Sequence, residues 1–139
     1  MNQPSPEKSG QQKRFVILRH HFPGGAVGEF SDHFDLMLEQ ESQLATWRLE
    51  VIPDPDQAVP ATRLADHRKV YLNYEGPVSG DRGTVEQVTA GTYEICQETD
   101  SCLEVLMTTA DESIRLKILA GEKGSLTVVR IGTPNRLSQ

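Results

Sequence analysis

Apolar and polar residues alternate most regularly in the stretch from Ser31 to Glu39. Successive side chains of a β-strand point to opposite faces, so this segment would separate its residues into two sets. One face would carry Phe34, Leu36 and Leu38, and the other His33, Asp35, Met37 and Glu39. We therefore expect a strand with one face in the core and one face that carries chemistry.

An apolar run from Arg14 to His21 predicts a second, largely buried strand that ends at a pair of histidines. The loop that follows, 22–30, is rich in glycine and excludes a regular element. A hairpin-like return through this loop would bring the end of the first strand beside His33. Alternation resumes from Leu44 to Val51, with Trp47 expected as a core anchor.

Residues 58–63 are expected to form a short helical or irregular turn, and residues 64–71 a helical turn. A spacing of four residues would place His67 and Tyr71 on one helical face, where an imidazole and a phenol converge. The alternative is a surface histidine beside a packed tyrosine.

The second half of the chain is a succession of short apolar runs separated by turn residues. Such regular spacing, with little helical periodicity, predicts a mainly β fold, a compact antiparallel β-barrel with little helix. The expected strands are Thr84 to Val88, Gly91 to Gln97, Cys102 to Thr108, Ile114 to Leu119 and Ser125 to Ile131.

The length of 139 residues predicts one domain, over residues 13–132, between a polar tail at 1–12 and a short tail at 133–139. No apolar run approaches the ~20 residues of a membrane span, so we expect a cytoplasmic protein. The two cysteines, Cys96 and Cys102, lack metal-binding spacing and are expected to be reduced. The formal net charge of −6 argues against nonspecific coating of long duplexes, but permits binding at a single strand end.

His33 and Asp35 lie two residues apart on one strand face, from which both could reach one divalent ion. A further histidine would complete a three-residue facial site. The competing interpretation is a half-buried strand whose polar residues face solvent.

Several segments in fixed order resemble a known family. They are 15–20, 33–39, Trp47, 66–71, 74–77, 121–124 and 128–130. Together they resemble the 3′-phosphoesterase domain of bacterial DNA ligase D and its stand-alone relatives, over roughly residues 14–131. The resemblance implies a β-barrel enzyme that uses Mn²⁺, or another divalent metal, to trim ribonucleotides or a phosphate from DNA 3′ ends. The implied partners are primer-template 3′ ends and DNA ligase or polymerase repair proteins.

The resemblance also implies residue roles. The metal ligands fall on His20, His33 and Asp35, with His21 as a neighbouring alternative to His20, and the residues that contact the scissile phosphate fall on His67 and Tyr71. Met37 departs from the pattern, because the family carries an arginine there that can bind a phosphate. Arg19 or Arg63 could replace the missing cation, and Glu29, Asp32 and Glu39 could form outer-shell hydrogen bonds to the ligands.

The sequence is therefore compatible with three functions. The first is a metal-dependent 3′-end phosphoesterase. The second is a catalytically impaired relative that binds a nucleic-acid end or a protein, which Met37 and the negative charge favour. The third is a non-haem iron oxygenase, which the His-x-Asp spacing suggests but which is disfavoured because His67 is the only histidine after Asp35.

Overall fold

The computed structural model describes residues 12–24 and 31–132, which form one sheet of nine antiparallel strands. Its elements are β1 (Lys13–His21), β2 (His33–Glu39), β3 (Leu44–Leu49), β4 (Ala58–His67), the 3-10 helix η2 (Lys69–Leu72), β5 (Gly76–Pro77), β6 (Thr84–Glu98), β7 (Cys102–Thr108), β8 (Ser113–Ala120), the 3-10 helix η3 (Glu122–Gly124) and β9 (Leu126–Ile131). The expected mainly β, antiparallel fold with little helix is confirmed. Apart from Gln12, the two expected tails lie outside the described residues.

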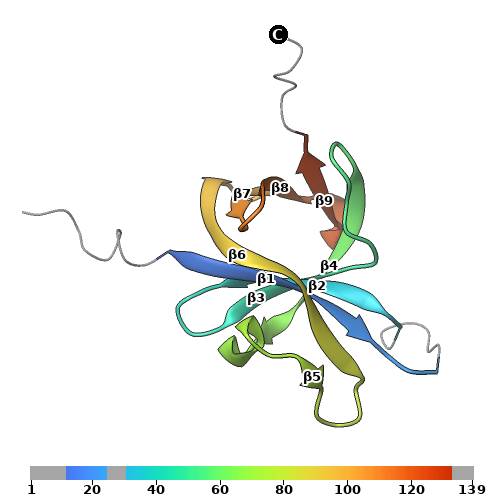
Figure 1. Cartoon of the computed structure of the whole chain (residues 1–139). Coiled ribbons are helices and arrows are strands. Elements are labelled where there is room, and N and C mark those ends of the chain that lie inside the picture. The colour runs from blue at the N-terminus through green and yellow to red at the C-terminus, as the bar shows by residue number, and fades with distance from the viewer. Residues whose placement is uncertain (1–11, 25–30, 133–139) are drawn as a thin grey trace, which may run out of the picture.

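The strands follow the order β1-β2-β3-β4-β9-β8-β7-β6-β5, and β1 also pairs with β6. This additional pairing closes the sheet into a ring from which only β5 is left out, so the molecule is barrel-like (Figure 1). Closure satisfies the hydrogen bonds of strands that would otherwise be exposed edges. Within the described part of the chain, no helix has the length and apolar character needed to cross a membrane.

Two local predictions are wrong. Residues 58–67 form strand β4 and not a turn followed by a helical turn. This strand has few buried residues and weak alternation, and its conformation is set by its neighbours, since it pairs with β3 on one side and β9 on the other.

The second correction concerns β6, which is one continuous strand where two were expected. Gly91, which suggested a turn, lies inside this strand, and a Cβ at this position would lie 1.9 Å from the carbonyl oxygen of Thr108. The glycine therefore permits the close approach of β7, which is a second common reason for glycine within a strand.

Two apolar clusters lie on opposite faces of β1 and β2. The larger one contains Phe15, Ile17, Leu36 and Leu38 together with Trp47 and side chains of β7, β8 and β9. Trp47 is therefore a core residue, as expected. The smaller one contains Val16, Leu18, Met37, Leu44, Leu72, Val78 and Val85.

The smaller cluster covers the face of β2 that carries His33, Asp35 and Met37. In Figure 1 the segment from η2 to β5 lies on the side of β1 and β2 opposite to β7, β8 and β9. Leu72 of this segment and Val78, which directly follows β5, pack on the same strand faces as Met37, and those faces continue to His20 and Asp35. Both faces of β2 are therefore largely buried, which excludes the interpretation of a strand with a solvent-facing polar side.

Candidate metal centre

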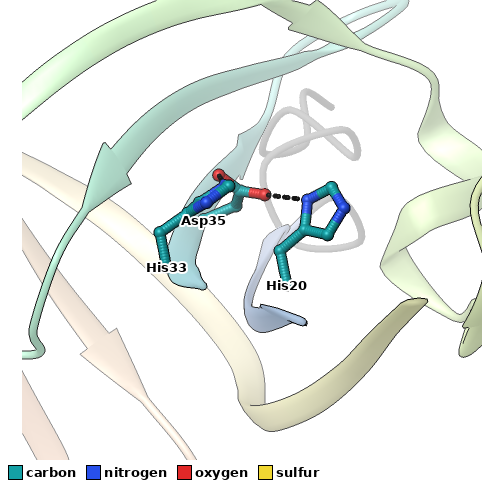
Figure 2. Close-up of side chains that lie close together, drawn as sticks. All are labelled: His20, His33 and Asp35. Atoms are coloured by element: carbon teal, nitrogen blue, oxygen red, sulfur yellow. Dashed lines mark ion pairs between the residues drawn. The ribbon is translucent and has the colours of Figure 1, made fainter. Parts of the chain in front are cut away.

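The antiparallel register of β1 and β2 brings His20, His33 and Asp35 together. His20 is the direct cross-strand partner of His33, and Asp35 follows two residues later on the same face of β2. Figure 2 shows His33 and Asp35 together on β2, with the ring of His20 facing the Asp35 carboxylate from β1. Nδ1 of His20 lies 3.7 Å from Oδ2 of Asp35, and Nε2 of His33 lies 3.2 Å from Oδ1.

Backbone carbonyls determine which nitrogen of each imidazole faces the carboxylate. Nε2 of His20 donates a hydrogen bond to the carbonyl oxygen of Arg82 at 2.6 Å, and Nδ1 of His33 donates one to the carbonyl oxygen of Ser31 at 2.9 Å. A carbonyl oxygen only accepts, so these two nitrogens carry protons. In the neutral imidazoles, Nδ1 of His20 and Nε2 of His33 therefore present lone pairs towards Asp35, an arrangement typical of histidine metal ligands.

The donor atoms of the three side chains lie close enough together that they could hold a metal ion. One ligand atom from each of the three residues lies within 4.8 Å of the other two. Bonds of about 2.1 Å place neighbouring ligand atoms ~3.0–3.4 Å apart. The separation of 3.2 Å between His33 and Asp35 lies in this range, and the separation of 3.7 Å between His20 and Asp35 is longer. His33 is 5% exposed and Asp35 is 2% exposed, and Oδ1 of Asp35 is buried without a hydrogen-bond partner. An unpaired buried carboxylate oxygen is costly, and a cation would compensate it.

The electrostatics of the site couple the three side chains. Burial favours the neutral form of Asp35, but the polar contacts and charges of His20 and His33 outweigh burial, so the pKa of Asp35 is lowered. Burial disfavours the imidazolium of His33, but Asp35 outweighs burial, so the pKa of His33 is raised. Asp35 is therefore ionised near neutral pH, and it attracts positive charge in the form of a proton or a cation.

His21, the neighbouring alternative to His20, belongs to a different cluster. Its Nδ1 lies 2.8 Å from Oδ2 of Asp32, and the other oxygen of Asp32 accepts a hydrogen bond from the backbone N–H of Phe22 at 2.7 Å. These hydrogen bonds, from Phe22 and then His21, lower the pKa of Asp32. The structure thus groups His20, and not His21, with His33 and Asp35.

A cavity of about 230 Å³ opens beside the triad. It is lined by His20, Asp35, Met37, Asp66, His67, Arg68, Tyr71, Val78, Ser79, Arg82 and Val85. His67 lies at the end of β4, and Tyr71 lies in η2, with their ring centroids 5.7 Å apart. The expected convergence of these two rings is therefore present, although a strand end and a 3-10 helix produce it.

The cations expected to replace an arginine at position 37 do not line this cavity. Arg19 pairs with Asp32 at 3.4 Å, and the guanidinium of Arg63 lies 4.9 Å from the centroid of the Trp47 ring and 2.9 Å from Asp66. Two of the expected outer-shell carboxylates, those of Glu39 and Asp32, bind other groups. Glu39 accepts hydrogen bonds from Arg14 and Lys69, Asp32 is bonded as described above, and Glu29 lies outside the described residues.

The residues that orient the ligands were not identified from the sequence. Phe22 stacks on His20 with ring centroids 4.3 Å apart, and the carbonyl groups of Arg82 and Ser31 bind the two imidazoles. Every residue has a carbonyl group, so sequence patterns carry no signal for these roles. Neither protein-family models nor curated proteins give a match to this chain.

Proposed function

We propose that this protein is a metal-dependent phosphoesterase that trims DNA 3′ ends carrying a ribonucleotide or a 3′-phosphate. One observation carries the proposal. The triad of His20, His33 and Asp35 and the pair His67 and Tyr71 come from separate strands and a 3-10 helix, and residues from both groups line a single cavity. The order of motifs that resembles the DNA ligase D 3′-phosphoesterase domain supports the same activity.

His20, His33 and Asp35 would hold the divalent ion, for which Mn²⁺ is the first candidate because its sites accept mixed nitrogen and oxygen ligands. When bound, such an ion polarises a phosphate oxygen and lowers the pKa of coordinated water. Asp35 supplies the negative charge of this site, and the two backbone carbonyls keep the imidazole rings in the ligating orientation.

His67 is suited to move a proton. Its Nδ1 donates a hydrogen bond to the carbonyl oxygen of Ala65 at 2.9 Å, so proton exchange with a bound phosphoester takes place at Nε2. A protonated Nε2 would give its proton to the leaving oxygen, and the phenol of Tyr71 would donate a hydrogen bond to a phosphate oxygen. A tetrahedral phosphate group is small enough for the cavity beside these rings.

The test is a Mn²⁺-dependent cleavage assay on primer-templates whose primer ends in one ribonucleotide or in a 3′-phosphate. The parent should cleave, His33→Ala should not, and His67→Ala should be slowed by ~100-fold or more, the usual contribution of general acid catalysis. His21→Ala is the matched control, since His21 lies in the separate Asp32 cluster. Cleavage that persists in His33→Ala, or that needs no metal, would contradict the proposal.

A second candidate is a binding module that recognises a nucleic-acid end or a protein without cleaving it. Met37 favours this alternative, because it lines the cavity, is 1% exposed and offers no charge to a phosphate. An inactive parent that still binds a 3′-phosphate end in the presence of Mn²⁺ would support the binding module.

A further inference from the structure

The cavity beside the metal centre is lined by two arginines to which no sequence pattern assigned a role. Arg68 connects β4 to η2, and Arg82 lies in the turn that leads into β6. Both residues line the cavity, as does Met37. The β4–η2 connection and the turn before β6 therefore each contribute a cation to the lining of the cavity, to which Met37 contributes none.

The guanidinium of Arg82 is held at the cavity by a neighbouring lining residue. Its Nε donates a hydrogen bond to the carbonyl oxygen of Ser79 at 2.8 Å, and one terminal nitrogen lies 3.5 Å from the Ser79 hydroxyl. Because no carboxylate pairs with it among the described residues, its charge remains available to an anion.

Arg68 is less restrained than Arg82. Within the described part of the chain, its guanidinium makes no hydrogen bond or ion pair, and it is exposed. It also lines an adjoining cavity, which shares Arg68, Tyr71 and Ser79 with the first one. Arg68 thus lies where the two cavities meet.

The acidic residues of the cavity leave a net attraction for anions. Asp66 is bound to the guanidinium of Arg63, and Asp35 belongs to the metal centre. The positive charges left to interact with a ligand are those of Arg68 and Arg82, together with a divalent cation once it is bound. Guanidinium groups bind phosphate oxygens through charge-assisted and often bidentate hydrogen bonds.

We propose that Arg68 and Arg82 form the phosphate-binding pair of this protein, and that they perform the task for which position 37 lacks a cation. The ligand is a phosphate ester whose charged group lies between the metal centre and the two guanidinium groups. This proposal rests on the proposed function for the nature of the ligand, but it concerns binding and does not require turnover.

The test measures binding of a fluorescein-labelled oligonucleotide to the Mn²⁺-loaded protein by fluorescence anisotropy. In this oligonucleotide a methylene group replaces the bridging oxygen of the 3′-phosphate, so that no cleavage occurs. Arg68→Gln and Arg82→Gln should each raise the Kd by about tenfold, the effect of losing one hydrogen bond to a charged group. Arg115→Gln is the matched control, because Arg115 is a partly exposed arginine of β8 that pairs with Glu104 and lies outside the cavity.

Salt dependence separates a phosphate contact from a structural effect. Each glutamine variant should reduce the slope of log Kd against log salt by ~0.7, as expected for one lost phosphate contact on a single strand. Arg82→Lys should restore this slope and part of the affinity. The Kd for Mn²⁺ should stay within twofold of the parent value, because the side-chain substitution retains the carbonyl group that binds His20.

The outcomes also separate this proposal from the proposed function. If both glutamine variants bind within twofold of Arg115→Gln and keep its salt slope, the arginine pair is excluded, even if the parent cleaves 3′ ends. If the parent does not cleave but loses affinity in both variants as expected, the arginine pair stands and the phosphoesterase activity is excluded.

Discussion

Nε2 of His20 donates a hydrogen bond of 2.6 Å to the backbone carbonyl oxygen of Arg82. The bond joins the end of β1 to the turn that precedes β6, and it leaves Nδ1 of His20 facing Asp35. A single residue, Arg82, therefore orients a candidate metal ligand through its backbone and lines the cavity through its place in the turn. The conformation of this turn should consequently affect metal binding.

A substitution at Gly83 would test whether the conformation of this turn affects metal binding. It has a φ of +77°, and a Cβ at this position would lie 2.2 Å from the carbonyl oxygen of His21. Gly83→Ala should lower the free energy of unfolding by about 1–3 kcal/mol and weaken Mn²⁺ binding, because β1 or the turn must move. Urea denaturation and Mn²⁺ titration measure the two effects.

The matched control for this substitution is Gly124→Ala. Gly124 has the same φ of +77°, but no atom lies within 4 Å of the position that its Cβ would occupy. This variant should lose stability through backbone strain alone and bind Mn²⁺ like the parent. Equal Mn²⁺ affinities in the two variants would show that the turn does not orient His20.

The carboxylate of Asp35 should be essential for metal binding. Asp35→Asn keeps the shape of the side chain but removes the charge that faces both histidines, so the Kd for Mn²⁺ should rise by more than the ~10–100-fold typical of outer-shell changes. Asp32→Asn is the control, since the Asp32 carboxylate binds His21 and the Phe22 backbone. Electron paramagnetic resonance of free Mn²⁺ provides the measurement, and similar affinities in the two variants would exclude this site.

Met37 should resist replacement by a charged residue. It is 1% exposed and packs in the smaller apolar cluster, so Met37→Arg should lower the free energy of unfolding by about 3 kcal/mol, while Met37→Leu should cost less than about 1.5 kcal/mol. Urea denaturation of both variants is the measurement. An arginine variant as stable as the parent would mean that the guanidinium leaves the cluster for the cavity, where its effect on cleavage can then be measured.

Tyr93 should make stability decline at alkaline pH. Its hydroxyl donates a hydrogen bond to the carbonyl oxygen of Glu39 at 2.7 Å, and burial, followed by the charges of Glu39 and Glu98, raises its pKa to about 12. The unfolded value is about 10, so the stabilisation is fully present below pH ~10 and is lost as the pH rises towards ~12.

Tyr93→Phe should remove this part of the alkaline decline and cost about 1 kcal/mol at neutral pH, the net value of one hydrogen bond. Denaturation curves between pH 8 and pH ~12 measure the effect. Tyr71→Phe serves as the control and should keep the decline, because Tyr93 is unchanged. A parent with flat stability over this range would contradict the shifted pKa.

The sequence alone determined the mainly β, antiparallel character of the fold and the limits of several strands. Cys102–Thr108 matches a predicted strand, and His33–Glu39 lies within the predicted strand Ser31–Glu39, because the alternation of apolar and polar residues along a strand is a local pattern. It also indicated His33 and Asp35 as a pair on one strand face, whereas His20 was indicated as the third ligand only by the resemblance to the DNA ligase D 3′-phosphoesterase domain.

Only the tertiary structure decided the remaining features. β4 becomes a strand because β3 and β9 supply its hydrogen bonds, and β6 is continuous because Gly91 admits the close approach of β7. The choice of His20 over His21 depends on the cross-strand register with His33. The carbonyl groups that orient the imidazoles, and the approach of Arg68 and Arg82 to one cavity, follow from chain closure, which joins residues distant in sequence and leaves no local pattern.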